Sequence, residues 1–68
     1  MRNVLGLAPA VRELAYDLAA LPTEEFDTVT RLIRTPFRDI TDEDRAVLKN
    51  LIGSDDLDLI LKAWKAIT

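Results

Sequence analysis

The last segment of the chain, Leu57–Ile67, has the strongest helical pattern in the sequence and constrains the fold most. At about 100° per residue, most of its apolar side chains fall on one side of a helix: Leu57, Ile60, Leu61, Trp64 and Ile67. The apolar surface continues around the back at Leu59, Ala63 and Ala66. The remaining polar stripe is narrow and holds only Asp58, Lys62 and Lys65. Surface helices usually have a narrower apolar face. We therefore expect this helix to be contacted on more than one side, within a small bundle or partly by another chain.

The size of the chain limits its core. With 68 residues it is expected to form one domain, residues 1–68. A domain this small buries only about 60% of the surface that its unfolded chain exposes, and such domains often depend on disulfides, metals or partner chains. The sequence contains neither cysteine nor histidine, which excludes disulfides, thiol catalysis and Cys/His zinc sites. Partner chains are then the expected source of additional stability.

Prolines divide the first half of the chain into helices. Pro9 suits the first turn of a helix, where its missing N–H costs nothing, and a helix is predicted at about 9–20. Pro22 ends this helix, because the residue before a proline is pushed out of the helical region. A second helix is predicted at about 24–34, before Pro36. We expect a tight turn after it, with Phe37 filling the corner between helices.

Capping residues define the second half. Thr41 is an expected N-cap with Asp44 three residues later, and a third helix is predicted at about 42–52. Gly53 is expected to close it as a C-terminal cap, and Ser54 to cap a last helix at about 55–67. The helical periods of the first three helices predict their inward apolar positions. These are Val11, Leu14, Ala15, Leu18, Leu21, Phe26, Val29, Leu32, Ile33, Val47, Leu48, Leu51 and Ile52.

The predicted fold is therefore all-α, a compact bundle of four short helices with a folded-back N-terminal segment. Gly6 disfavours a long helix through that segment. Val4, Leu5 and Leu7 are too apolar for a free tail, so the segment is expected to pack onto the bundle.

The charge of the chain argues for a cytoplasmic protein with a protein partner. The formal net charge is −3, whereas nucleic-acid-binding proteins usually present a basic face. An acidic surface suits a basic partner surface. No apolar run approaches the roughly 20 residues that span a bilayer, so no membrane association is expected. Acidic residues open the last three helices and basic residues close them, an order that complements the helix dipole.

Two groups of charged residues were considered as sites. Arg31, Arg34 and Arg38 form a possible basic patch, which is either a solvated face partly neutralised by Asp27 and Asp39 or a site for phosphate or an acidic partner. The second group is Asp55, Asp56 and Asp58. A calcium-binding loop would also need a central glycine and a final glutamate, which do not follow these residues. We expect no metal, no cofactor and no catalytic site.

A helix-turn-helix motif fits the segment 45–62, with Gly53 in the turn. Its second helix would present the three aspartates to DNA, where they oppose attraction to phosphate. A DNA-binding regulator of helix-turn-helix type, using the basic patch, is therefore the alternative and not the main prediction.

The main prediction is a small acidic, non-enzymatic protein–protein interaction module that regulates or inhibits a larger partner, as compact bacterial and phage regulators do. The hypothetical partner-binding residues are Tyr16, Leu59, Ala63 and Ala66, which have no place on the main apolar faces. The N-terminal segment could instead cover them. A further alternative is a structural, assembly or docking module that self-associates, for example as a homodimer.

Overall fold

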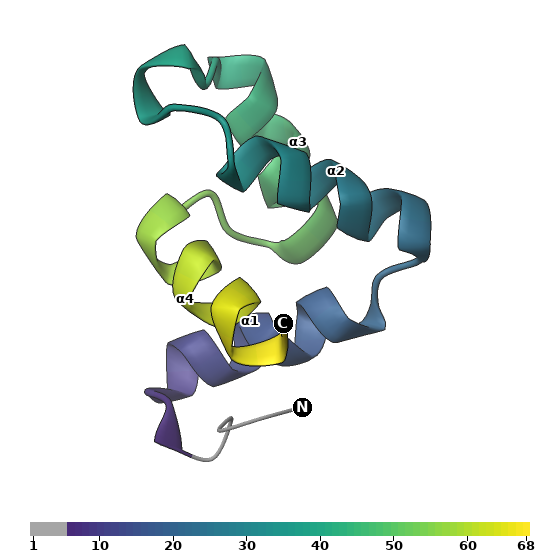
Figure 1. The fold of residues 1–68 in the computed structure, drawn as a ribbon, viewed down its shortest axis with the longest axis vertical. Helices are drawn as coiled ribbons and strands as arrows, with labels where there is room; N and C mark the ends of the chain where they lie inside the picture. Colours follow the sequence, from purple (N-terminus) through teal and green to yellow (C-terminus); the bar gives the residue numbers. More distant parts are fainter. Residues whose placement is uncertain (1–5) are drawn as a thin grey trace.

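A computed structural model describes residues 6–68 and confirms the all-α fold. It contains four α-helices and one short 3-10 helix: α1 (Pro9–Ala20), α2 (Thr23–Ile33), η2 (Phe37–Asp39), α3 (Asp42–Ile52) and α4 (Leu57–Ile67). No strand occurs within this described range. Figure 1 shows α2 and α3 in the upper half of the molecule, α4 and α1 in the lower half, and the η2 link at the upper left.

The predicted helix boundaries agree closely with the structure. Pro9 begins α1, and the backbone leaves the helix at Leu21 with extended angles of φ −68° and ψ 143°. The Thr41 side chain accepts a hydrogen bond of 3.1 Å from the Asp44 amide, and the Thr41 amide donates one of 3.1 Å to the Asp44 carboxylate. Gly53 ends α3 at φ 73°, in the left-handed region that glycine enters at low cost. Pro9, the Thr41–Asp44 pair and Gly53 therefore begin, cap and end helices at the positions predicted from the sequence.

The start of α4 is one correction. The helix begins at Leu57, two residues later than predicted, and its cap is Asp56, not Ser54. The Asp56 carboxylate accepts a hydrogen bond of 3.3 Å from the Leu59 amide. The Ser54 hydroxyl instead accepts a bond of 3.2 Å from the Asp56 amide, which stabilises the turn ahead of the helix. Serine and aspartate are about equally good caps, so composition alone did not decide between them.

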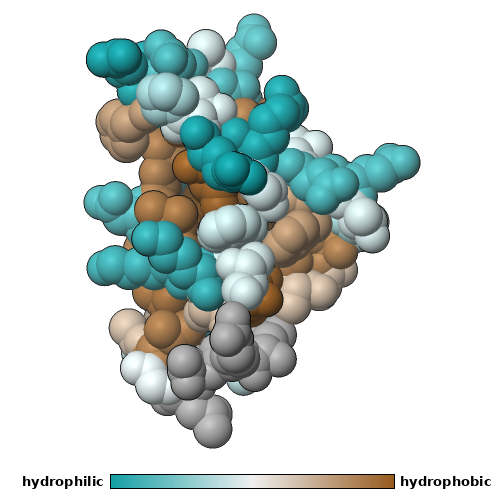
Figure 2. All heavy atoms as spheres, viewed as in Figure 1, coloured by the Kyte–Doolittle hydropathy of each residue, from teal (hydrophilic) through white to brown (hydrophobic). Residues whose placement is uncertain are grey.

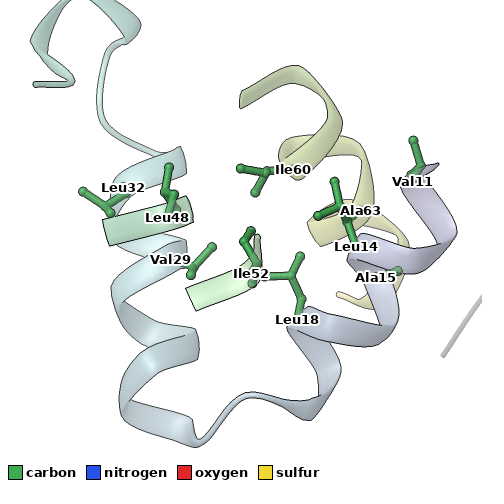
Figure 3. Close-up of a cluster of buried hydrophobic side chains, with 10 residues drawn as sticks. All are labelled: Val11, Leu14, Ala15, Leu18, Val29, Leu32, Leu48, Ile52, Ile60 and Ala63. Carbon is green, nitrogen blue, oxygen red and sulfur yellow. The ribbon is translucent and has the colours of Figure 1, made fainter. Parts of the chain in front are cut away.

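The core lies between all four α-helices, and α4 is contacted by more than one of them. Figure 3 shows the ten buried apolar side chains: Val11, Leu14, Ala15, Leu18, Val29, Leu32, Leu48, Ile52, Ile60 and Ala63. α4 packs most extensively against α1 and also against α2. Trp64 adds a link to α2, because its indole N–H donates a hydrogen bond of 3.0 Å to the Thr30 hydroxyl. The prediction of a last helix enclosed on more than one side is confirmed.

Two predicted inward residues face solvent instead. Phe37 is 68% exposed and does not fill the corner, because it lies on the short η2 turn between α2 and α3. Val47 is 39% exposed. It precedes Leu48 by one position, or about 100° around the helix, and Leu48 is on the face that α3 buries, together with Ile52.

The N-terminal segment is described only from Gly6 onward. Leu7 packs, partly buried, against the core, as predicted. The prediction for Val4 and Leu5 falls outside the described residues. Within residues 6–68, none of the helices has the length and hydropathy that crossing a membrane would require.

Candidate partner-binding surface

An exposed aromatic ring is presented by the link between α2 and α3. Two hydrogen bonds hold the turn that carries it: the Asp39 amide donates to the Pro36 carbonyl at 2.8 Å, and the Ile40 amide to the Phe37 carbonyl at 3.2 Å. The Arg45 guanidinium from α3 lies over the Phe37 ring, 5.3 Å from its centroid, within the range of a cation–π interaction. The ring is therefore supported from one side while most of its surface meets solvent.

An apolar cavity opens beside this ring. Its volume is about 170 Å³, and it lies where the end of α2, the η2 turn and the start of α4 meet. It is lined by Ile33, Thr35, Phe37, Ile40, Leu57, Asp58 and Leu61. Figure 2 shows brown, apolar atoms down the left of this face, where η2 and α4 lie in Figure 1, with teal, polar side chains between them.

A second depression adjoins the first and is more acidic. It has a volume of about 310 Å³ and shares Phe37, Leu57 and Asp58 with the apolar cavity. Its other lining residues are Arg45, Asp55 and Asp56. We call the lining residues of these two depressions together the Phe37 surface.

Some charged side chains of the Phe37 surface contact other residues of the chain, and others do not. Arg45, besides contacting Phe37, has Nη1 at 3.5 Å from the Asp55 carbonyl oxygen, a long hydrogen bond. The Asp56 carboxylate caps α4. The carboxylates of Asp55 and Asp58 have no hydrogen bond or ion pair to another residue in the described part of the chain. Two negative charges beside the apolar cavity are therefore available to a binding partner.

The four residues predicted to border a partner contact do not form one surface. Tyr16 is 48% exposed, whereas Ala63 has no exposed surface and belongs to the core, which corrects its assignment to a contact. Leu59 and Ala66 are half-buried and line different depressions. The depression at Leu59 is lined also by residues of α1 and of the α3–α4 link, whereas the depression at Ala66 is lined also by residues of the N-terminal segment. The predicted surface is divided because α1 covers the back of α4.

The basic patch residues are all accessible. Arg31, Arg34 and Arg38 are exposed at the end of α2 and on η2. Within residues 6–68 none of the three forms an ion pair, so the expected partial neutralisation by Asp27 and Asp39 does not involve direct pairing. The possible helix-turn-helix pair, α3 and α4, packs mainly on α1 and α2 and less on each other.

Sequence reasoning missed the Phe37 surface. The signal in the sequence was the position of Phe37 directly after Pro36, in the link between two helices. There it belongs to the apolar face of neither helix. We assigned Phe37 to the interior because aromatic side chains are usually well buried, and periodicity gives no direction for a residue in a link. Sequence reasoning identified the acidic residues of this surface as helix-start charges and as an incomplete cation site, but did not connect them with Phe37.

Residues 6–68 contain no group of three potential metal ligands close together. No protein-family model matches the sequence, and comparison with curated proteins and with solved structures gave no significant match. The function is therefore argued from the Phe37 surface itself.

Proposed function

We propose that this protein is a small, non-enzymatic interaction module that binds a larger protein through the Phe37 surface and thereby regulates or inhibits it. The observation that carries the proposal is the 68% exposure of Phe37 beside an apolar cavity. A cytoplasmic location belongs to the same proposal and is tested by cell fractionation.

The physical argument concerns the free energy of hydration. Burying apolar surface stabilises a fold by about 25 cal/mol for each Å² removed from water. Apolar surface that stays exposed does not make this contribution. Phe37 is the most exposed of the large apolar residues identified in the described chain, in a domain whose core is small. A partner that covers the ring recovers this free energy on binding. Aromatic residues and arginine are also enriched at protein interfaces, and Phe37 and Arg45 lie in contact.

The cavity favours a protein partner over a small molecule. At about 170 Å³ it lies below the roughly 300–1,000 Å³ of typical ligand pockets, and the adjoining depression, at about 310 Å³, is at the lower end of that range. A cavity of about 150 Å³ holds a benzene-sized group. The space next to Phe37 therefore matches one side chain of a protein, inserted beside the ring.

The test is crosslinking from the ring position. Phe37 is replaced by the photoreactive analogue p-benzoylphenylalanine, and cells of the source organism are irradiated. The matched control carries the same analogue at Val47, which is also exposed but does not line the Phe37 surface. We expect a specific protein adduct from position 37 and none from position 47. Equal adducts from both positions, or none from position 37, would contradict the proposal. An adduct to a second copy of the chain would favour self-association.

A further inference from the structure

The geometry points to a partner segment that is basic and inserts one apolar side chain beside Phe37. This inference rests on the proposed function and adds the chemistry of the partner. It combines three observations: the size of the apolar cavity, the position of the carboxylates around it, and the contacts of Arg45, the one cation among the lining residues of the two depressions.

The cavity accepts one apolar side chain. Four aliphatic residues supply most of its lining, one from α2, one directly after η2 and two from α4, and Phe37 forms one wall. They are Ile33, Ile40, Leu57 and Leu61. The depression is open to solvent, and its volume of about 170 Å³ is close to the roughly 150 Å³ that accommodates a benzene-sized group. A leucine, isoleucine, methionine or phenylalanine of the partner therefore fits, and a long apolar face does not.

The rim of the cavity is negative. Asp58 lines the apolar cavity and also the adjoining depression, where Asp55 and Asp56 lie. Asp58 and Asp55 have carboxylates free of partners within residues 6–68. Complementary charge chiefly determines specificity and association rate. Lysine or arginine residues flanking the inserted side chain are the complement of this rim.

Arg45 does not cancel the negative charge of the rim. Its guanidinium is the only cation among the lining residues of the two depressions, against three aspartates. It is held over the Phe37 ring at 5.3 Å and near the Asp55 carbonyl at 3.5 Å. An acidic segment seated in the two depressions would therefore meet one engaged cation and two free carboxylates, which disfavours it, and the accessible Arg34 and Arg38 lie outside both linings.

A peptide selection tests the chemistry of the partner without knowing its identity. A random peptide library displayed on phage is depleted on Phe37→Ala and then selected on the wild-type protein, and the selected peptides are tested for binding to Val47→Ala as the matched control. We expect peptides that bind the wild type and Val47→Ala but not Phe37→Ala. Their sequences should share one large apolar residue flanked by lysine or arginine.

Charge variants supply the quantitative readout. The selected peptides should bind Asp55→Asn/Asp58→Asn roughly two- to tenfold more weakly than the wild type. This difference should vanish in about 1 M salt, where the Debye length is ~3 Å. Replacing Lys62, which lies outside both depressions, by glutamine should not weaken binding.

The outcomes separate the inference from the proposed function. Phe37-dependent peptides that are neutral or acidic, or that bind the double variant as well as the wild type, would overturn the inference and leave the Phe37 surface as a binding site. Recovery of no Phe37-dependent peptide would count against both.

Discussion

The Trp64 indole N–H donates a hydrogen bond to the Thr30 hydroxyl at 3.0 Å and so joins α4 to α2, across a separation of 34 positions in the sequence. Both residues are partly buried. The bond supplies a partner for a polar group that would otherwise lose water on folding. It also fixes how α2 lies on α4, and these two helices supply Ile33, Leu57 and Leu61 to the Phe37 surface.

Removing either partner of this bond should destabilise the fold. We expect Trp64→Phe and Thr30→Val each to lower the free energy of unfolding by about 1 kcal/mol or more. The loss of free energy of unfolding in the double variant should be smaller than the sum of the two single losses, because each single variant already lacks the same bond. Urea unfolding followed by circular dichroism measures all three. Strictly additive losses would mean that the bond contributes nothing in solution.

The left-handed residue at the end of α3 gives a second prediction. A Cβ at Gly53 would meet no atom within 4 Å, so backbone strain at φ 73° is the main cost of a side chain there. We expect Gly53→Ala to lower the free energy of unfolding by about 1 kcal/mol, and Gly53→Asn by less, because asparagine tolerates this conformation better. Gly6→Ala, also without a close neighbour, is the matched control. Equal losses for alanine and asparagine would contradict the explanation by strain.

The position of Leu59 gives a third prediction. Leu59 packs against the core, so Leu59→Glu should place a carboxylate in partly apolar surroundings and lower the free energy of unfolding by about 1–3 kcal/mol. Lys62→Glu introduces the same group at an exposed position of the same helix and should change it by less than about 0.5 kcal/mol. Thermal unfolding of both variants gives the comparison. A Leu59→Glu protein as stable as the wild type would restore Leu59 as a candidate contact residue.

The basic patch gives a fourth prediction, for nucleic acid. Arg31, Arg34 and Arg38 are accessible, but the acidic start of α4 opposes insertion into a DNA groove. We expect no retardation of duplex DNA in a low-salt gel shift at micromolar protein. Salt-sensitive retardation that is lost when the three arginines are replaced by alanine would favour the DNA-binding alternative.

The parts of the fold that the sequence predicts are those set by local chemistry. Pro9, Pro22 and Gly53 act through backbone geometry, and the Thr41–Asp44 capping box acts within one turn, so their effects do not depend on distant residues. The enclosure of α4 follows from the number of its apolar positions. These features need no knowledge of how the helices are arranged.

The candidate site depends on that arrangement and was not predicted. Phe37 lies in a link, where helical periodicity gives no direction, and its exposure follows from how η2 projects beyond α2 and α3. Ala63 was assigned to a contact because the sequence does not indicate which helix covers the back of α4. In the structure α1 covers it. A surface assembled from α2, η2 and α4 therefore appears only once the helices are placed.

The most direct test of the account is the effect of Phe37→Ala on partner affinity and on stability, measured together. The partner is the protein captured from position 37, and Val47→Ala is the control. Because Phe37 is mostly exposed, the Phe37→Ala substitution should change the free energy of unfolding of the protein by less than about 0.5 kcal/mol. The affinity for the partner should fall by roughly tenfold or more, as expected for an interface anchor. Unchanged affinity, or loss of the folded state, would contradict the account.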